Sequence, residues 1–112
     1  PPAHGAFIAA AVMNSAKLFA QWQSEVANMR ERIKIMRQRL FDILTEKLPH
    51  KDFSYFTKQR GMFSYTGLTP EQVQRLQDEF AVYLLSSGRM CVAGLNKANI
   101  DYVANAFAAV LE

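Results

Sequence analysis

The sequence of 112 residues has little of the chemistry that marks a disulfide scaffold or a membrane protein. Its single cysteine, Cys91, cannot form an internal disulfide, which excludes a small oxidised scaffold. No uninterrupted apolar run reaches the roughly 18 residues that span a bilayer. The apolar stretch 6–13 is short and has no basic segment before it, which excludes a signal peptide there. We therefore expect no membrane partner.

The sequence also lacks a complete set of catalytic or metal-binding residues. His4 and His50 lie far apart, without acidic or thiol neighbours at metal-ligand spacing, so no metal site is expected. Ser86-Ser87-Gly88 does not match the G-x-S-x-G pattern of a nucleophile elbow. The glycines are spread through predicted turns and form no phosphate-binding loop. Cys91 lies beside Val92 in an apolar segment and is predicted to be a small core residue rather than a nucleophile.

What is present is ordinary globular composition. Half of the residues are hydrophobic, 21% are charged and the net charge is +3. This predicts one compact domain and neither requires nor excludes an acidic partner. The chain opens on Pro1-Pro2 without an initiator methionine. Two prolines ahead of a helix are more typical of an interior junction than of a natural terminus, so we expect a fragment of a longer protein.

Helical periodicity dominates the first 48 residues. Residues 2–13 predict a short helix, which has no polar face and should therefore pack against something. Asn14-Ser15 offers an N-cap for a second helix over 16–48, which Pro49 ends. At about 45–50 Å this helix is longer than so small a domain is wide, so part of it is expected to contact something outside the chain. Its apolar residues recur at spacings of three and four: Leu18, Trp22, Val26, Met29, Ile33, Met36, Leu40 and Ile43.

The remaining residues, 49–112, are predicted to alternate short strands with helices. Aromatic and apolar clusters predict strands at 53–56, 62–65, 82–84 and 90–92. Helices packed on a small sheet make the fold class α+β.

Two helices are predicted between and after these strands. Thr69-Pro70-Glu71-Gln72 is a helix start with an N-cap, a proline in the first turn and a capping box, and the helix should run to Phe80. Asn96 is predicted to cap the last helix. The inner face of that helix should carry Ile100, Val103, Phe107 and Val110 or Leu111.

A group of basic residues lies off the apolar stripe of the long predicted helix. A solvated helix face is the favoured interpretation, because Glu31 interrupts the group and no aromatic platform or recognition motif accompanies it. No nucleic-acid partner is therefore expected, although a free-standing helical interaction or nucleic-acid-binding module remains the alternative. The group consists of Arg30, Arg32, Lys34, Arg37 and Arg39.

Arg89 has a different context. It follows Gly88 and precedes the apolar run 90–92, so its guanidinium must find an anion or reach solvent. A surface arginine at the start of a strand is the simpler interpretation, and an arginine that binds a carboxylate through two N–H groups is the more specific alternative.

Four segments carry a resemblance to a known family. They are PPAHGA at 1–6, MRERI at 29–33, GMFSYTGL at 61–68 and SGRMCVAGL at 87–95. These segments resemble the last quarter of the aspartate and aromatic aminotransferases, which are homodimeric, fold-type I enzymes dependent on pyridoxal phosphate. The match runs in register along the whole chain.

The resemblance implies roles for individual residues. Arg89 matches the arginine that forms a bidentate salt bridge with the substrate α-carboxylate, and Phe63 matches the phenylalanine that lines the active site beside it. Pro1, Pro2 and Gly5 would be structural residues near the subunit interface. No catalytic residue is carried over.

The resemblance also implies an architecture. The chain would be the C-terminal small domain of such an enzyme. Residues 1–15 would form an interdomain or interface helix, 16–48 the helix that links the large and small domains, and 49–112 the α/β layer of the small domain.

The full-length parent would transfer an amino group between an amino acid, aspartate or possibly an aromatic one, and a 2-oxo acid such as 2-oxoglutarate. It would be a homodimer, in the cytoplasm or the mitochondrion. None of the six lysines matches the lysine that binds the family's cofactor. We therefore predict that this chain alone does not bind pyridoxal phosphate covalently and is inactive.

Overall fold

The computed structural model describes residues 2–112, so the expectation for Pro1 lies outside the described residues. The chain divides into two compact units, one ending at Arg32 and the other covering Ile33–Glu112. None of the described helices is both long enough and apolar enough to cross a membrane.

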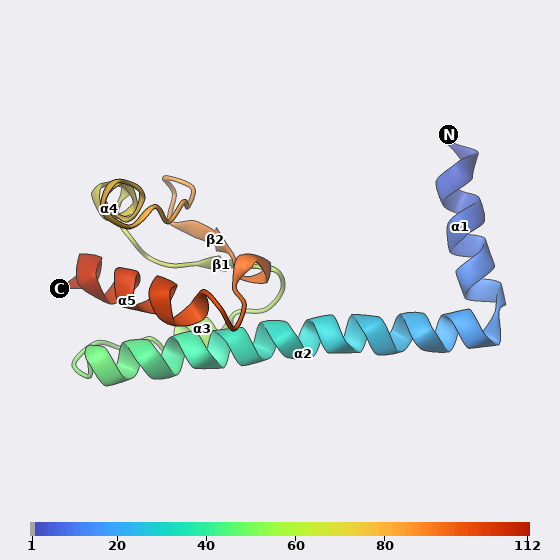
Figure 1. Ribbon diagram of the computed structural model, residues 1–112, viewed down its shortest axis with the longest axis horizontal. Coiled ribbons are helices and arrows are strands. Elements are labelled where there is room, and N and C mark those ends of the chain that lie inside the picture. The colour runs from blue at the N-terminus through green and yellow to red at the C-terminus, as the bar shows by residue number, and fades with distance from the viewer. Residues whose placement is uncertain (1) are drawn as a thin grey trace. The chain divides into compact units, whose positions relative to one another are not determined.

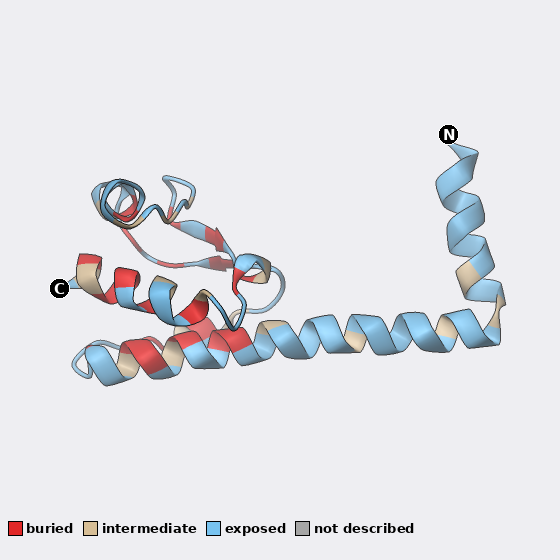
Figure 2. Ribbon diagram, in the orientation of Figure 1, coloured by how far each residue is buried: buried red, intermediate tan, exposed pale blue. Residues whose placement is uncertain are grey.

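The first unit consists of α1 (Ala3–Asn14) and the beginning of α2 (Ala16–Lys47). Both helices agree with the predicted ones to within two residues. The Oγ atom of Ser15 accepts a hydrogen bond from the Leu18 amide at 3.3 Å, which confirms the predicted N-cap. None of the residues 2–32 is buried within this chain, as Figure 2 shows. The expected packing of α1 therefore does not occur inside the chain.

The second unit consists of the end of α2 and six further elements. They include a two-stranded antiparallel sheet in which Ser64 lies opposite Met90. The unit is mostly helical with this small sheet, which confirms the α+β class. Its further elements are α3 (Tyr55–Lys58), β1 (Phe63–Tyr65), α4 (Pro70–Phe80), β2 (Arg89–Cys91), the 3-10 helix η1 (Val92–Gly94) and α5 (Ile100–Leu111).

Within this unit α5 occupies the centre. In Figure 1 it runs beside the second half of α2, with α4 and the two strands on its other side. Its Phe107 is 1% exposed and belongs to one core cluster with Leu44 of α2 and Leu76 of α4. Polar contacts lie at the rim of this core: Arg39 Nη2 to Asp101 Oδ1 at 3.0 Å, and Tyr102 Oη to Phe80 O at 2.6 Å.

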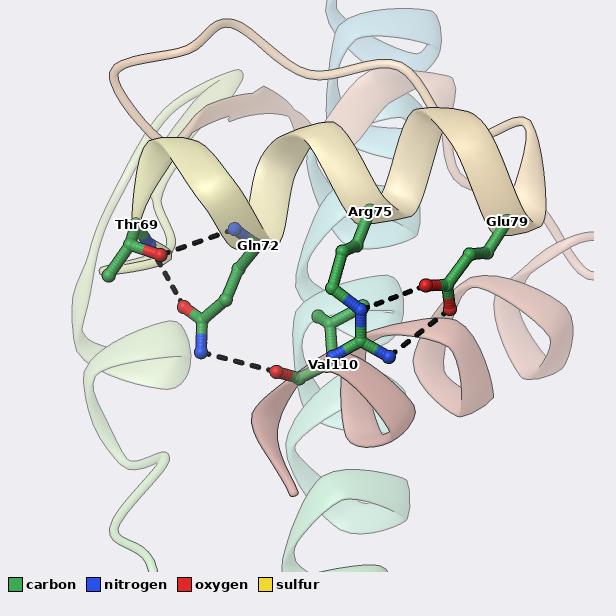
Figure 3. Close-up of polar contacts among 5 residues, drawn as sticks. All are labelled: Thr69, Gln72, Arg75, Glu79 and Val110. Atoms are coloured by element: carbon green, nitrogen blue, oxygen red, sulfur yellow. Dashed lines mark hydrogen bonds and ion pairs between the residues drawn. The ribbon is translucent and has the colours of Figure 1, made fainter.

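The start of α4 confirms the predicted capping box (Figure 3). The Gln72 amide donates to Thr69 Oγ1 at 3.2 Å, and the Thr69 amide donates to Gln72 Oε1 at 2.9 Å. The same glutamine also donates from Nε2 to the Val110 carbonyl of α5 at 3.2 Å. One side chain therefore caps α4 and ties it to α5.

Thr69→Ala is expected to lower the free energy of unfolding by about 1 kcal/mol, because one amide of the first turn loses its side-chain acceptor. Urea denaturation of the chain, followed by circular dichroism, measures the change. Thr69→Ser is the matched control and should stay close to the unsubstituted chain, because it keeps the hydroxyl. Equal losses for the two variants would contradict the capping role.

The predicted strand at 53–56 is wrong. Asp52 Oδ1 accepts the Ser54 amide at 2.8 Å, a bond that also lowers the pKa of Asp52, and the chain then turns into α3. Phe53 and Phe56 are both buried, at the three-residue spacing of a helical turn. Their aromatic character is typical of strands, but their spacing is helical.

The predicted strand at 82–84 is also wrong. The Val82 amide donates to the Leu76 carbonyl as part of the C-terminal cap of α4, and no strand within residues 2–112 pairs with residues 82–84. The start of the last helix is displaced as well. Asn96 Oδ1 accepts the amides of Ala98 and Asn99, so this residue stabilises a turn, and α5 begins four residues after it, at Ile100.

Candidate functional site

The two-stranded sheet has one buried face and one open face. Ser64 and Met90 point into the core, with exposures of 3% and 4%. Because side chains alternate along a strand, their neighbours Phe63, Tyr65, Arg89 and Cys91 point outwards and are exposed. The open face therefore presents two aromatic rings, a guanidinium and a thiol.

Exposed Cys91 corrects the prediction that it belongs to the core. Met90 and Val92, on either side of it, occupy the core instead. Because residues 90–92 are all apolar, the sequence did not show that side chains alternate between the core and solvent along this strand.

Arg89 and Phe63, the two predicted site residues, lie against each other on the open face. The Cζ atom of Arg89 is 4.2 Å from the centroid of the Phe63 ring. The register explains this contact, because Tyr65 is opposite Arg89 and Phe63 is its diagonal neighbour.

The Arg89 guanidinium has no carboxylate partner among residues 2–112. Its side chain makes no hydrogen bond in this part of the chain, and its contact with Phe63 uses a ring face and no N–H group. All five N–H donors of the guanidinium are thus available to an anion. An exposed arginine held by an aromatic ring is an arrangement suited to a bidentate carboxylate.

The backbone ahead of Arg89 is tightly held. Gly88 has a φ of +86°, a conformation that favours glycine. Its carbonyl accepts two hydrogen bonds from Thr66, one from the amide at 2.9 Å and one from Oγ1 at 2.6 Å. Its amide donates to the Leu85 carbonyl at 2.9 Å. Because both the amide and the carbonyl of Gly88 are hydrogen-bonded, the backbone position of Arg89 at the start of β2 is fixed.

Sequence reasoning missed Arg37, the best-connected side chain beneath this sheet. It is 5% exposed, and burial lowers the pKa of its guanidinium. Nη2 donates to the carbonyls of Gly61 and Phe63 at 2.8 and 2.9 Å. Nη1 donates to the Phe56 carbonyl at 3.2 Å and to Ser64 Oγ at 2.9 Å.

The prediction that the basic residues of α2 form a solvated face is therefore wrong for one of them, Arg37. Arg30, Arg32, Lys34 and Arg39 are exposed, whereas Arg37 is buried. A signal for its burial was present in the spacing. It lies four residues after Ile33 and three before Leu40, on the apolar stripe itself.

Arg37 and Gln59 together cover the outer edge of β1. The bonds from Val92 N to Met62 O and from Thr66 N to Gly88 O lie on the β2 side. In an antiparallel ladder the backbone groups of Phe63 and Tyr65 then point to the other edge. There Gln59 accepts from the Tyr65 amide at 3.0 Å and donates to its carbonyl at 3.1 Å, while Arg37 binds the Phe63 carbonyl.

The chemistry of the described side chains bears on metal and cofactor binding. The described chain contains no group of three His, Cys, Asp or Glu side chains that could hold a metal ion. A Schiff-base lysine needs a desolvated setting or a neighbouring cation that depresses its pKa. All six lysines are exposed: Lys17, Lys34, Lys47, Lys51, Lys58 and Lys97.

The sequence model of the aminotransferase class I and II family matches residues 2–107. The chain belongs to this family.

Its relatives include aromatic and aspartate aminotransferases. It is 57% identical over 111 residues to the aromatic-amino-acid aminotransferase and 48% identical to the aspartate aminotransferase of Escherichia coli K12. Each alignment covers 99% of this chain and 28% of the relative. The chain thus spans little more than a quarter of the length of these relatives.

Solved structures agree with this assignment. The aromatic aminotransferase of Psychrobacter sp. B6, co-crystallised with aspartic acid, matches with a TM-score of 0.97 and 57% identity over 100% of this chain and 28% of its own. The aromatic-amino-acid aminotransferase of Burkholderia pseudomallei, covalently bound to pyridoxal phosphate, matches with a TM-score of 0.97 and 53% identity over the same shares.

Proposed function

We propose that this chain is the part of an aspartate or aromatic aminotransferase that binds the α-carboxylate of the substrate, and that Arg89 is the residue that binds it. The observation that carries the proposal is the exposed Arg89 guanidinium, which contacts Phe63 and has no carboxylate partner among residues 2–112. The same chemistry serves both substrate classes, because an α-carboxylate is common to all amino acids.

Arg89 would act by positioning. Two parallel N–H groups of a guanidinium match the two oxygens of a carboxylate, so the pair fixes the plane of the carboxylate as well as its location. The substituents on the neighbouring carbon are oriented as a result, which lowers the entropic cost of reaching the transition state. Phe63 would cover one side of the cation and strengthen its interaction with the anion by excluding water.

The cofactor would be held by other parts of the parent protein. Pyridoxal phosphate supplies the electron sink in transamination, but the exposed lysines of this chain do not fit a covalent site for it. We propose that the lysine and the phosphate-binding groups belong to a large domain that α2 links to residues 49–112, and that α1 lies at an interface of a homodimer. The isolated chain would then transfer no amino group to a 2-oxo acid.

Arg89→Ala in the full-length enzyme is expected to lower kcat/KM by about 10- to 100-fold, because a charge-assisted bidentate contact with the substrate is lost. Steady-state kinetics with aspartate and with phenylalanine measure the effect. The loss should be similar for the two substrates, since both carry the same α-carboxylate.

Arg75→Ala is the matched control. Arg75 is also an exposed arginine, but its Nε atom pairs with Glu79 Oε1 at 2.9 Å on α4. Its removal should leave kcat/KM unchanged. An unchanged kcat/KM for Arg89→Ala would remove Arg89 from the site.

A further inference from the structure

We propose that Arg37 is a positioning residue for substrate binding, which acts by holding β1 and therefore holding Phe63 against Arg89. The inference rests on the proposed function of Arg89 and deepens it. It extends the carboxylate site from the open face of the sheet to a buried side chain of α2.

The hydrogen bonds of Arg37 have an unusual destination for a buried cation. A buried guanidinium is normally paired with an acidic group. Arg37 instead donates to four neutral oxygens, three backbone carbonyls and the hydroxyl of Ser64. Hydrogen bonds from a charged donor are stronger than neutral ones. The hydrogen bonds of this guanidinium therefore all go to neutral groups in β1 and in the segments before it.

The partners of Arg37 are distributed so as to fix one strand. Two of them, Phe63 O and Ser64 Oγ, lie in β1, and Gly61 O lies directly before it. The fourth, Phe56 O, belongs to α3. Ser64 Oγ in turn donates to Gln59 Oε1, the group that accepts the Tyr65 amide. A two-stranded sheet is only marginally stable alone, so this network does for β1 what a third strand does in a larger sheet.

The network leads directly to the contact with Arg89. The carbonyl that Arg37 holds at 2.9 Å belongs to Phe63, the residue whose ring lies 4.2 Å from the Arg89 guanidinium. A shift of the β1 backbone would move this ring away from its place under the cation. Arg89 would keep its N–H donors but lose its contact with the Phe63 ring. We expect weaker binding of carboxylates as a result, although Arg37 itself does not touch the substrate.

The test uses the full-length enzyme and succinate, a dicarboxylate that has no amino group to transfer, so that binding is measured without reaction. Arg37→Lys keeps the charge but cannot reach both pairs of acceptors with one nitrogen. It is expected to raise the Kd of succinate and the KM of aspartate about three- to tenfold, as for residues coupled in one network. In an Arg89→Ala background the same substitution should change Kd by less than about twofold, because Arg37 acts through Arg89.

Ile43→Val is the matched control on the same helix. Ile43 is buried on α2, and its truncation should lower Tm slightly while leaving the Kd of succinate unchanged. If Arg37→Lys does not fold, Ser64→Ala tests the same network, with an expected rise in the Kd of succinate of about two- to fivefold.

The outcomes separate the two proposals. If Arg89→Ala leaves Kd unchanged, the proposed function fails. If Arg89→Ala raises Kd but the folded Arg37→Lys or Ser64→Ala enzyme binds succinate normally, only the positioning role fails. Equal effects of Arg37→Lys with and without Arg89 would also overturn it, since Arg37 would then act elsewhere.

Discussion

Phe107→Ala is expected to lower the free energy of unfolding of residues 33–112 by about 3–5 kcal/mol. Phe107 is 1% exposed and among the largest fully buried side chains of the chain. It lies on α5, the helix between α2 and the layer of α4 and the strands, so the cavity would open at the centre of the unit. A small domain is stable by only about 5–15 kcal/mol in total, so the loss is a large fraction of that stability.

Urea denaturation followed by circular dichroism measures this loss. Asn105→Ala is the matched control, because Asn105 is an exposed residue of the same helix. It should change the free energy of unfolding by less than about 0.5 kcal/mol. A loss below about 1 kcal/mol for Phe107→Ala would show that α5 does not form the centre of the core.

Gly88→Ala is expected to destabilise the second unit by about 2–6 kcal/mol, the sum of a conformational and a steric cost. The φ of +86° costs an alanine about 1–3 kcal/mol. A Cβ atom would also lie 3.0 Å from the Leu68 carbonyl oxygen and 3.2 Å from Thr66 Oγ1, and overpacking of this kind adds about 1–3 kcal/mol. Because the next residue is Arg89, carboxylate binding by the full-length enzyme should weaken as well.

Gly67→Ala separates the two contributions. Gly67 has a similar φ of +73°, but a Cβ atom there would meet nothing within 4 Å. It should therefore show the conformational cost alone and a smaller loss of stability than Gly88→Ala. Chemical denaturation of both variants provides the comparison. Equal losses would mean that the contact with Leu68 relaxes without cost.

The parts of the fold that sequence predicted well are those set by local chemistry. The capping box of Thr69 and Gln72 involves residues three apart, so the pattern and the structure coincide. The same holds for Ser15 ahead of α2. Strand β1 followed from its aromatic residues, and the class α+β followed from the order of the elements.

The parts that sequence did not predict depend on partners distant in the chain. The run 82–84 has strand character but no neighbouring strand in the described part of the chain. The spacing of Arg37 on the apolar stripe indicates burial, but its acceptors at Gly61, Phe63 and Ser64 are 24 to 27 residues away, so local sequence does not identify them. Of the candidate site, Arg89 and Phe63 were identified by resemblance. Their contact could not be predicted, because it depends on the register of the two strands.

The side chains of Arg37 and Gln59 along β1 have a consequence for self-association. Backbone groups left open at the margin of a sheet are a template on which another polypeptide can add a strand, the first step toward fibrils. Here the carbonyl of Phe63 and both backbone groups of Tyr65 are already occupied within the molecule. The open face of β1 therefore carries exposed aromatic rings, while three of the four backbone groups of Phe63 and Tyr65 at this edge are unavailable to a neighbouring chain.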